Sequence, residues 1–217
     1  MEEIDLLQRP KIKRNFDPNW RKEENRIIAR KFDKEFFDGE RINGYGGYKY
    51  DGRWVEVVER LKNIYNLNGT NSFLDVGCAK GFLLYDLKKV IPGIEIYGLD
   101  VSNYAVENCI EGVKENLVVG SADELPYETN SFDFVFSSDT LHNLPRDKCK
   151  KALQEIVRVC KPSGNMFIQV DSYRNKKEKN NLISWNLTAL TYMHVDEWLK
   201  FFKESGYNGD YFWTILD

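Results

Sequence analysis

The chain has 217 residues, a formal net charge of −3 and a sequence pI near 5.6. This length suits one well-buried domain with an added cap, and is too short for two ordinary domains. The acidic balance argues against a dedicated nucleic-acid-binding protein, because such proteins neutralise phosphates with a clustered basic excess. The one basic cluster, residues 174–179, is interpreted as a solvated loop face.

No apolar stretch approaches the ~20 residues that span a bilayer, and the first residues lack the basic-then-apolar order of a signal peptide. We therefore expect a cytoplasmic protein with no membrane contact. The cysteines form no C-x-x-C pair and have no histidine at zinc spacing, so we expect reduced, mostly buried thiols and no metal site. These cysteines are Cys78, Cys109, Cys149 and Cys160.

The head of the chain, residues 1–43, is charged and aromatic. Apolar side chains at helical spacing, including Ile28, Phe32 and Phe36, predict an amphipathic cap helix between residues 20 and 37. A glycine- and tyrosine-rich segment at 44–54 then interrupts the helical pattern. We expect residues 1–54 to form a cap and lid, and residues 55–217 to form the core of a single domain.

From residue 55 onward, helical and strand patterns alternate. The expected strands span residues 73–76, 94–99, 117–119, 132–136, 165–170 and 211–215. The expected helices span residues 55–65, 80–90, 103–111, 147–160 and 195–205. This alternation predicts an α/β fold with a parallel, doubly wound sheet.

The turn after the first expected strand, Asp75-Val-Gly-Cys-Ala-Lys-Gly81, is the most informative part of the chain. Gly77 and Gly81 can bring the backbone close to a ligand, and the following helix points unpaired N–H groups over the turn. The second strand ends about twenty residues later at Asp100, where a carboxylate can accept hydrogen bonds from both ribose hydroxyls. The pattern predicts a nucleotide cradle.

Asp75 decides which nucleotide the cradle suits. A dinucleotide site usually has a G-x-G-x-x-G pattern, whereas here an acid comes just before the first glycine. Such an acid would repel a pyrophosphate, yet it suits an ammonium or sulfonium ligand.

This arrangement resembles the class I S-adenosylmethionine-dependent methyltransferases, whose first strand ends in D-x-G-x-x-x-G and whose second ends in an acid. Residues 118–127, 130–145 and 153–164 resemble the later blocks of the small-molecule (type 11) branch, so the resemblance covers roughly residues 55–171. It implies a Rossmann-like, mostly parallel sheet of six to seven strands, S-adenosylmethionine as cofactor and S-adenosylhomocysteine as product.

Most of the cofactor site can be carried over from this resemblance. Asp75 would face the methionine ammonium, Asp100 would hold the ribose, and Ser121 stands where many relatives have an acid that binds the adenine amino group. Alternatively, Asp100 caps the helix that begins near residue 102, and Asp123 either shifts inward or is an exposed turn acid. The expected cofactor-binding residues are Asp75, Gly77, Cys78, Gly81, Asp100, Val101, Ser121, Ala122, Ser137 and Arg53.

Methyl transfer needs in-line positioning of an acceptor, and a base where the acceptor must lose a proton. His142, after the fourth expected strand, is the first candidate base, because an imidazole can take a hydroxyl proton at neutral pH; the alternative is that it supports the loop. Asp139 either orients His142, accepts a hydrogen bond from substrate or caps a helix. Asp171 can touch substrate at the carboxyl edge of the sheet, and His194 either touches substrate or caps the last helix.

The segment 44–54 is the most individual feature of the chain. Tyr45 and Tyr48 offer stacking faces for a substrate, and Arg53 offers a clamp for a carboxylate or phosphate, the cofactor's own carboxylate included. Plain turns, and an ion pair of Arg53 with Asp51 or Glu56, are the alternatives. The segment resembles one in methyltransferases of bacterial surface-polysaccharide pathways, some of which modify capsule phosphoramidates.

Three functional classes remain open. The first is O- or N-methylation of a small polar acceptor, including a sugar nucleotide or a capsule phosphoramidate precursor. The second is a protein or RNA methyltransferase, although Ser138-Asp-Thr-Leu141 does not match the (D/N)-P-P-(Y/F) sequence common in N-methylation of Asn, Gln or adenine. The third is a noncatalytic subunit that binds cofactor only. We expect no nucleic-acid partner, and the sequence is compatible with a monomer or a homodimer.

Overall fold

A computed structural model describes residues 1–9, 14 and 16–217. In this part of the chain six strands form one sheet in the order β3-β2-β1-β4-β5-β6, and every pairing is parallel. The strands are β1 (Ser72–Val76), β2 (Glu95–Asp100), β3 (Leu117–Val119), β4 (Phe132–Ser138), β5 (Cys160–Asp171) and β6 (Asp210–Thr214). The expected doubly wound α/β fold is confirmed.

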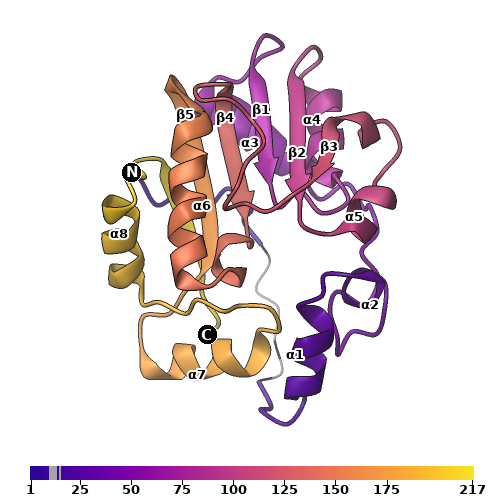
Figure 1. Cartoon of the computed structure of the whole chain (residues 1–217), viewed down its shortest axis with the longest axis vertical. Coiled ribbons are helices and arrows are strands. Elements are labelled where there is room, and N and C mark those ends of the chain that lie inside the picture. The colour runs from indigo at the N-terminus through magenta and orange to yellow at the C-terminus, as the bar shows by residue number, and fades with distance from the viewer. Residues whose placement is uncertain (10–13, 15) are drawn as a thin grey trace.

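Helices lie between the strands and in the head of the chain (Figure 1). The α-helices are α1 (Glu23–Ala29), α2 (Lys34–Phe37), α3 (Val55–Tyr65), α4 (Phe82–Val90), α5 (Asn103–Glu107), α6 (Arg146–Val159), α7 (Lys176–Trp185) and α8 (Val195–Glu204). Two short 3-10 helices, η1 (Lys114–Asn116) and η2 (Leu141–Asn143), precede β3 and α6.

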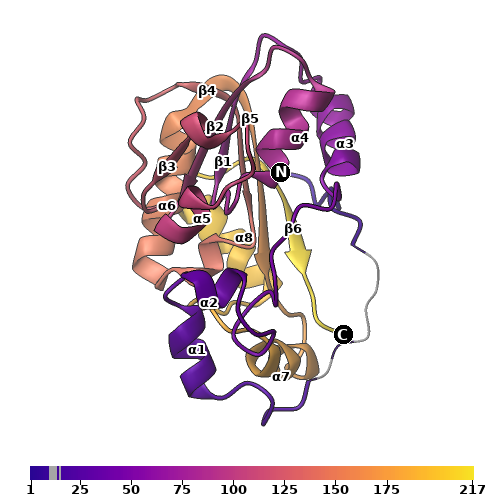
Figure 2. The ribbon, with the colours of Figure 1, turned by 90° about the vertical axis from the view of Figure 1, so that its right-hand side faces the viewer.

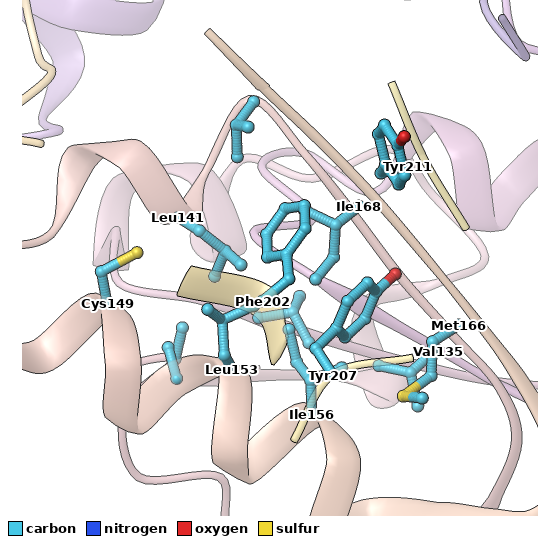
Figure 3. Close-up of a cluster of buried hydrophobic side chains, with 14 of the residues drawn as sticks. Val135, Leu141, Cys149, Leu153, Ile156, Met166, Ile168, Phe202, Tyr207 and Tyr211 are labelled. Carbon is cyan, nitrogen blue, oxygen red and sulfur yellow. The ribbon is translucent and has the colours of Figure 1, made fainter. Parts of the chain in front are cut away.

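The two faces of the sheet are covered by different helices because successive strand residues point to opposite sides. Phe73, Phe134 and Phe167 pack with α3 and α4 in one buried cluster. The next residue in each strand turns the other way, and Val135 and Ile168 pack with α6 and α8 in the second cluster (Figure 3). Near-continuous apolar strands are what a sheet covered on both faces requires.

The helices α1 and α2 of the cap, and α7, lie beyond the carboxyl ends of the strands, on the side where strand arrows end (Figures 1 and 2). The first residues of the cap lie along β6, where Glu3 bridges Tyr211. Arg26 of α1 donates to the Ile183 carbonyl at 2.7 Å, so the cap is in contact with α7. Every residue that follows a strand end therefore faces a space bounded by these segments. Open α/β sheets bind ligands at this edge.

The structure corrects two expectations about the helices. The cap contains two short helices, α1 and α2, in place of one helix over 20–37. The basic cluster at 174–179 is the start of α7, not a loop. None of the helices in the described ranges has the length and apolar character that crossing a membrane requires.

Candidate active site

The turn between β1 and α4 adopts the close-packed form that its glycines predict. Gly77 and Gly81 have φ values of 89° and 73°, in the left-handed region that favours glycine. A Cβ on Gly77 would lie 2.0 Å from the Thr140 Oγ1, so the loop after β4 leaves no room for a side chain. The Gly77 N–H donates to the Leu99 carbonyl at 2.7 Å, which joins the turn to the end of β2.

Asp75 lies at the base of this turn and is 5% exposed. Burial, together with the nearby charge of Asp100, raises the pKa of Asp75 to about 8. Among the described residues no hydrogen bond contributes to this pKa, which burial and Asp100 alone determine. A buried carboxylate without a partner is unfavourable in its charged form, and a cationic ligand would relieve it.

Asp100 is buried at the end of β2, one strand away from Asp75. Its two oxygens accept hydrogen bonds from the Ala79 N–H at 2.7 Å and the Ser102 N–H at 2.9 Å. The N-cap of α5 is Ser102, whose hydroxyl accepts from the Ala105 N–H, so Asp100 does not supply that cap's side-chain bond. The Val101 N–H also bonds this carboxylate. Its two oxygens have about four lone-pair sites in all, so capacity remains for the ribose.

The residues expected to surround an adenine lie beside Asp100. Val101 is 55% exposed, an open apolar surface at the mouth of the turn. Ser121 donates from its hydroxyl to Asp123, and Ala122 is buried between them. Asp123 is itself 7% exposed and lies 3.4 Å from the Lys148 ammonium. The interpretation of Asp123 as an exposed turn acid is therefore wrong.

Cys78 and Ser137 are buried and contribute to the frame of the site. The Cys78 N–H donates to the Leu99 carbonyl at 3.1 Å, and the Ser137 hydroxyl donates to the Val76 carbonyl at 2.9 Å. Both bonds join neighbouring strands where they end, so they hold the floor of the candidate site in place.

The segment after α2 is bound directly to the glycine turn, through residues that sequence patterns did not single out. The buried Lys80 ammonium contacts the Asp38 carboxylate at 2.6 Å and donates to the Tyr48 carbonyl at 3.2 Å. The Tyr104 hydroxyl also donates to Asp38, at 2.7 Å. The Tyr48 ring stacks on Phe82 with centroids 4.9 Å apart. The lid segment thus lies against the glycine turn between β1 and α4.

Tyr45 and Asp139 lie near each other at this edge of the sheet. Burial and the nearby charge of Asp139 raise the pKa of Tyr45 to about 12, although 45% of its surface is exposed. The ion pair of Asp139 with Arg9 holds the pKa of that carboxyl below its usual range against the effect of burial.

His142 is 2% exposed and is held by the chain around it. Its Nδ1 accepts from the Asp171 N–H at 3.1 Å, so the neutral ring carries its proton on Nε2, which lies 3.5 Å from the Asp171 carboxylate. Asn186 donates to the same carboxylate. Burial raises the pKa of Asp171. In this geometry His142 supports the loop from beneath. Neither ring nitrogen has a free lone pair that could take a proton from a methyl acceptor.

Arg53 and His194 both make local contacts. Arg53 is exposed and pairs with Asp51 at 2.5 Å, the local ion pair that was the alternative to a clamp, and its charge lies near Tyr48 and Arg9. His194 caps α8: its Nδ1 accepts from the Asp196 N–H, and Glu197 completes a capping box. The structure thus gives His194 the capping role, and its contact with substrate stays a prediction.

A polar hollow of about 390 Å³ lies at the opposite edge of the sheet, between Ser72, Tyr97 and Tyr127. It contains none of the acids at the carboxyl ends of the strands. Because ligands of open α/β sheets bind at the carboxyl ends of strands, we place the site around Asp75 and Asp100.

Comparison with known proteins gives the family of this chain. Residues 74–168 match the family described as a methyltransferase domain. A tRNA (carboxymethyluridine(34)-5-O)-methyltransferase of Arabidopsis thaliana is 30% identical over 149 residues, which cover 68% of this chain and 34% of the relative. Arginine-hydroxylase NDUFAF5, mitochondrial, of Mus musculus is 35% identical over 122 residues, 54% of this chain and 34% of the relative. The chain thus spans about a third of these curated relatives.

Among solved structures, Phospholethanolamine N-methyltransferase 2 of Haemonchus contortus, in complex with phosphomonomethylethanolamine and S-adenosylhomocysteine, has the same fold. Its TM-score is 0.62 at 20% identity, over 83% of this chain and 44% of that one. The family match, the parallel sheet and the two acids at the strand ends lead to one identification. This chain carries a domain of the class I S-adenosylmethionine-dependent methyltransferase family, and S-adenosylmethionine is its cofactor.

Proposed function

We propose that this protein transfers a methyl group from S-adenosylmethionine to an oxygen or nitrogen atom of a small polar acceptor. The observation that carries the proposal is the buried, unpartnered Asp75 carboxylate beside Asp100 at the glycine turn. A buried carboxyl group of this kind, whose charged form a cation would stabilise, fits a ligand that has a cationic amino-acid end and a ribose.

The residues present fit this cofactor in three places. Asp75 would face its ammonium, the free lone pairs of Asp100 would accept from the ribose hydroxyls, and Val101 would lie against the adenine face. When bound, the cofactor supplies an electrophilic methyl group on a sulfonium. The task of this chain is then to position the acceptor in line with that methyl group and to exclude water.

The acceptor would lie between the cap and the carboxyl edge of the sheet. Tyr45 and Asp139 line this space, and the lid segment is held over the glycine turn by Lys80 and Asp38. A site covered in this way favours a small molecule over a folded polymer. Sugar nucleotides and phosphoramidate precursors are both of this size and polarity.

We assign positioning, not base catalysis, to His142. Its Nδ1 is occupied by the Asp171 N–H, and its Nε2 faces the Asp171 carboxylate. Asp139 lies at the same edge of the sheet, but its ion pair with Arg9 makes it a weak base. An acceptor that is already nucleophilic, such as an amine or a phosphate-type oxygen, would need no further base from these residues.

A tRNA acceptor is the second candidate, because a curated relative with 30% identity is named as a tRNA methyltransferase. The net charge of −3 argues against it, since RNA binding depends on neutralising phosphates. A noncatalytic subunit would bind the cofactor without consuming it.

The test is a transfer assay with methyl-labelled S-adenosylmethionine and three sets of acceptors: small-metabolite and sugar-nucleotide pools, total tRNA and total protein. We expect S-adenosylhomocysteine and label to appear together in the small-molecule fraction. Asp75→Asn should abolish both signals. Label in tRNA alone would replace the small acceptor by RNA, and cofactor binding without turnover on any set would favour a noncatalytic subunit.

A further inference from the structure

Three arginines gather where the cap meets the end of α7: Arg14, Arg21 and Arg41. Arg21 is 2% exposed and donates to the Trp185 carbonyl and, at 3.2 Å, to the Arg41 carbonyl. Its Nε is buried and has no hydrogen-bond partner among the described residues. A buried guanidinium is thus only partly satisfied, and only by neutral groups.

No carboxylate in the described ranges pairs with any of these three side chains. The five residues outside those ranges are a proline, an isoleucine, an asparagine and two lysines, so they add no acid. Burial and the neighbouring positive charges of Arg41 and Arg26 lower the pKa of Arg21 to about 10. The positive charge here is uncompensated, and uncompensated buried charge is destabilising.

Neutral contacts explain the placement of the arginines but not their excess charge. The guanidinium carbons of Arg14 and Arg21 lie 5.1 Å and 5.2 Å from the centre of the Trp185 ring, on which they stack. Arg21 and Arg26 also donate to carbonyls in the last turn of α7, where the helix dipole favours cations. One cation is enough to satisfy that helix end. The helix dipole therefore does not explain the charges of Arg14 and Arg41.

The arginine cluster borders the candidate active site and is open to small molecules. Arg41 is exposed and Arg14 is half-buried. Arg41 donates to the Gly44 carbonyl, where the lid segment begins. Arg14 lies within electrostatic range of Arg9, Asp139 and Asp171, since all three influence its pKa. A molecule bound at the cluster would therefore lie near the charges of Asp139 and Asp171 at the carboxyl edge of the sheet.

We propose that Arg14, Arg21 and Arg41 bind the anionic oxygens of the methyl acceptor, a phosphate or carboxylate group, with the Trp185 ring as an apolar wall beside it. Guanidinium groups match such oxyanions with paired N–H donors. This inference rests on the proposed function, and it narrows the class of methyl acceptor from polar molecules to anionic ones. The anion would anchor one end of the acceptor at α7 and leave its other end at the carboxyl edge of the sheet.

The test is a calorimetric titration of inorganic phosphate, and separately of acetate, into the full chain at constant ionic strength, with and without saturating S-adenosylhomocysteine. The variants are Arg14→Gln and Arg41→Gln, which remove accessible charges and leave the buried Arg21 in place. Lys177→Gln is the control, because this exposed lysine lies at the start of α7, at the other end of the helix from Trp185. We expect saturable binding of phosphate or acetate, weakened about tenfold by each arginine variant and unchanged by the control.

Saturable binding of phosphate alone would assign a phosphate-bearing acceptor, and binding of acetate alone a carboxylate. Equal affinities in wild type and both arginine variants, or no anion binding at all, would overturn the inference. Failure of the proposed function is distinguishable, because it would appear in the transfer assay as absence of labelled small-molecule product, whatever the anion titrations give.

Discussion

Asp75 is the residue at which stability and function oppose each other. Its carboxyl group is buried beside a second acid, and its pKa is raised to about 8. The folded protein therefore holds a proton at this site that the unfolded chain releases above its ordinary pKa of 3.8. Stability from this group is complete at low pH and is lost as the pH rises towards 8.

We predict that Asp75→Asn makes the ligand-free protein more stable near pH 8, because the amide cannot acquire the buried charge. Each unit of pKa shift corresponds to about 1.4 kcal/mol, so the gain should grow with pH by up to that amount per unit. Thermal melting at about pH 5 and about pH 8 measures it. The variant should also lose most of the thermal shift that S-adenosylhomocysteine gives wild type. Equal melting temperatures at the higher pH would show that Asp75 has a partner in the folded protein.

His142 gives a second prediction at this scale. His142→Ala leaves the buried Asp171 N–H unpaired and should lower the free energy of unfolding by ~1 to 3 kcal/mol, with cofactor affinity unchanged. His142→Asn should recover part of the loss, because its side-chain carbonyl can take the place of Nδ1. Denaturant melts and calorimetry measure the two effects. If the Asn variant binds cofactor normally but its transfer rate falls by a factor of ~10² or more, the result would support His142 as the general base.

At the scale of elements, the sheet was predictable and the cap was not. The strands are short apolar runs bounded by turns, which carry a strong local signal; Asp75 lies next to the end of β1 and Asp100 ends β2. The α7 helix carries a weak one, since its sequence is polar and Leu182 is its one buried apolar residue. It is stabilised by its Asn175 cap and by an ion pair from the flanking Arg174 to Glu178.

The contacts that complete the site could not be read from local patterns because they join distant segments. Lys80 meets Asp38 across 42 positions, and Arg9 meets Asp139 across 130. In the sequence Lys80 stood out only as a lysine inside a glycine turn, and Arg9 did not stand out at all. Interactions of this kind depend on the fold that the apolar pattern produces.

The Lys80 contact gives a prediction about the lid. Asp38→Asn weakens the charge on which both the Lys80 ammonium and the Tyr104 hydroxyl depend, so residues 38–50 should exchange amide hydrogens faster while the sheet is unchanged. S-adenosylhomocysteine should slow exchange there in wild type. The exposed Glu40→Gln is the matched control. Equal amide hydrogen exchange with and without ligand would show that this segment packs statically and does not close over the ligand.

For the whole molecule, the sheet supplies the cofactor side of the site and the cap supplies the acceptor side. Asp75 and Asp100 come from strand ends, Tyr45 and Arg41 from the cap, and Trp185 from α7. These segments meet only at the carboxyl edge of the sheet (Figure 2). We therefore propose that residues 1–54 are a functional cap on a core of residues 55–217, and that acceptor choice depends on the cap.

The most direct test of the central claim is calorimetric titration of S-adenosylhomocysteine into wild type, Asp100→Ala and the exposed control Asp147→Ala. Wild type and the control should bind one equivalent with the same affinity. Asp100→Ala should bind more weakly by ~1 to 3 kcal/mol, because two charge-assisted hydrogen bonds to the ribose are lost together. No binding to wild type, or equal affinity in a folded Asp100→Ala protein, would contradict a cofactor site at these strand ends.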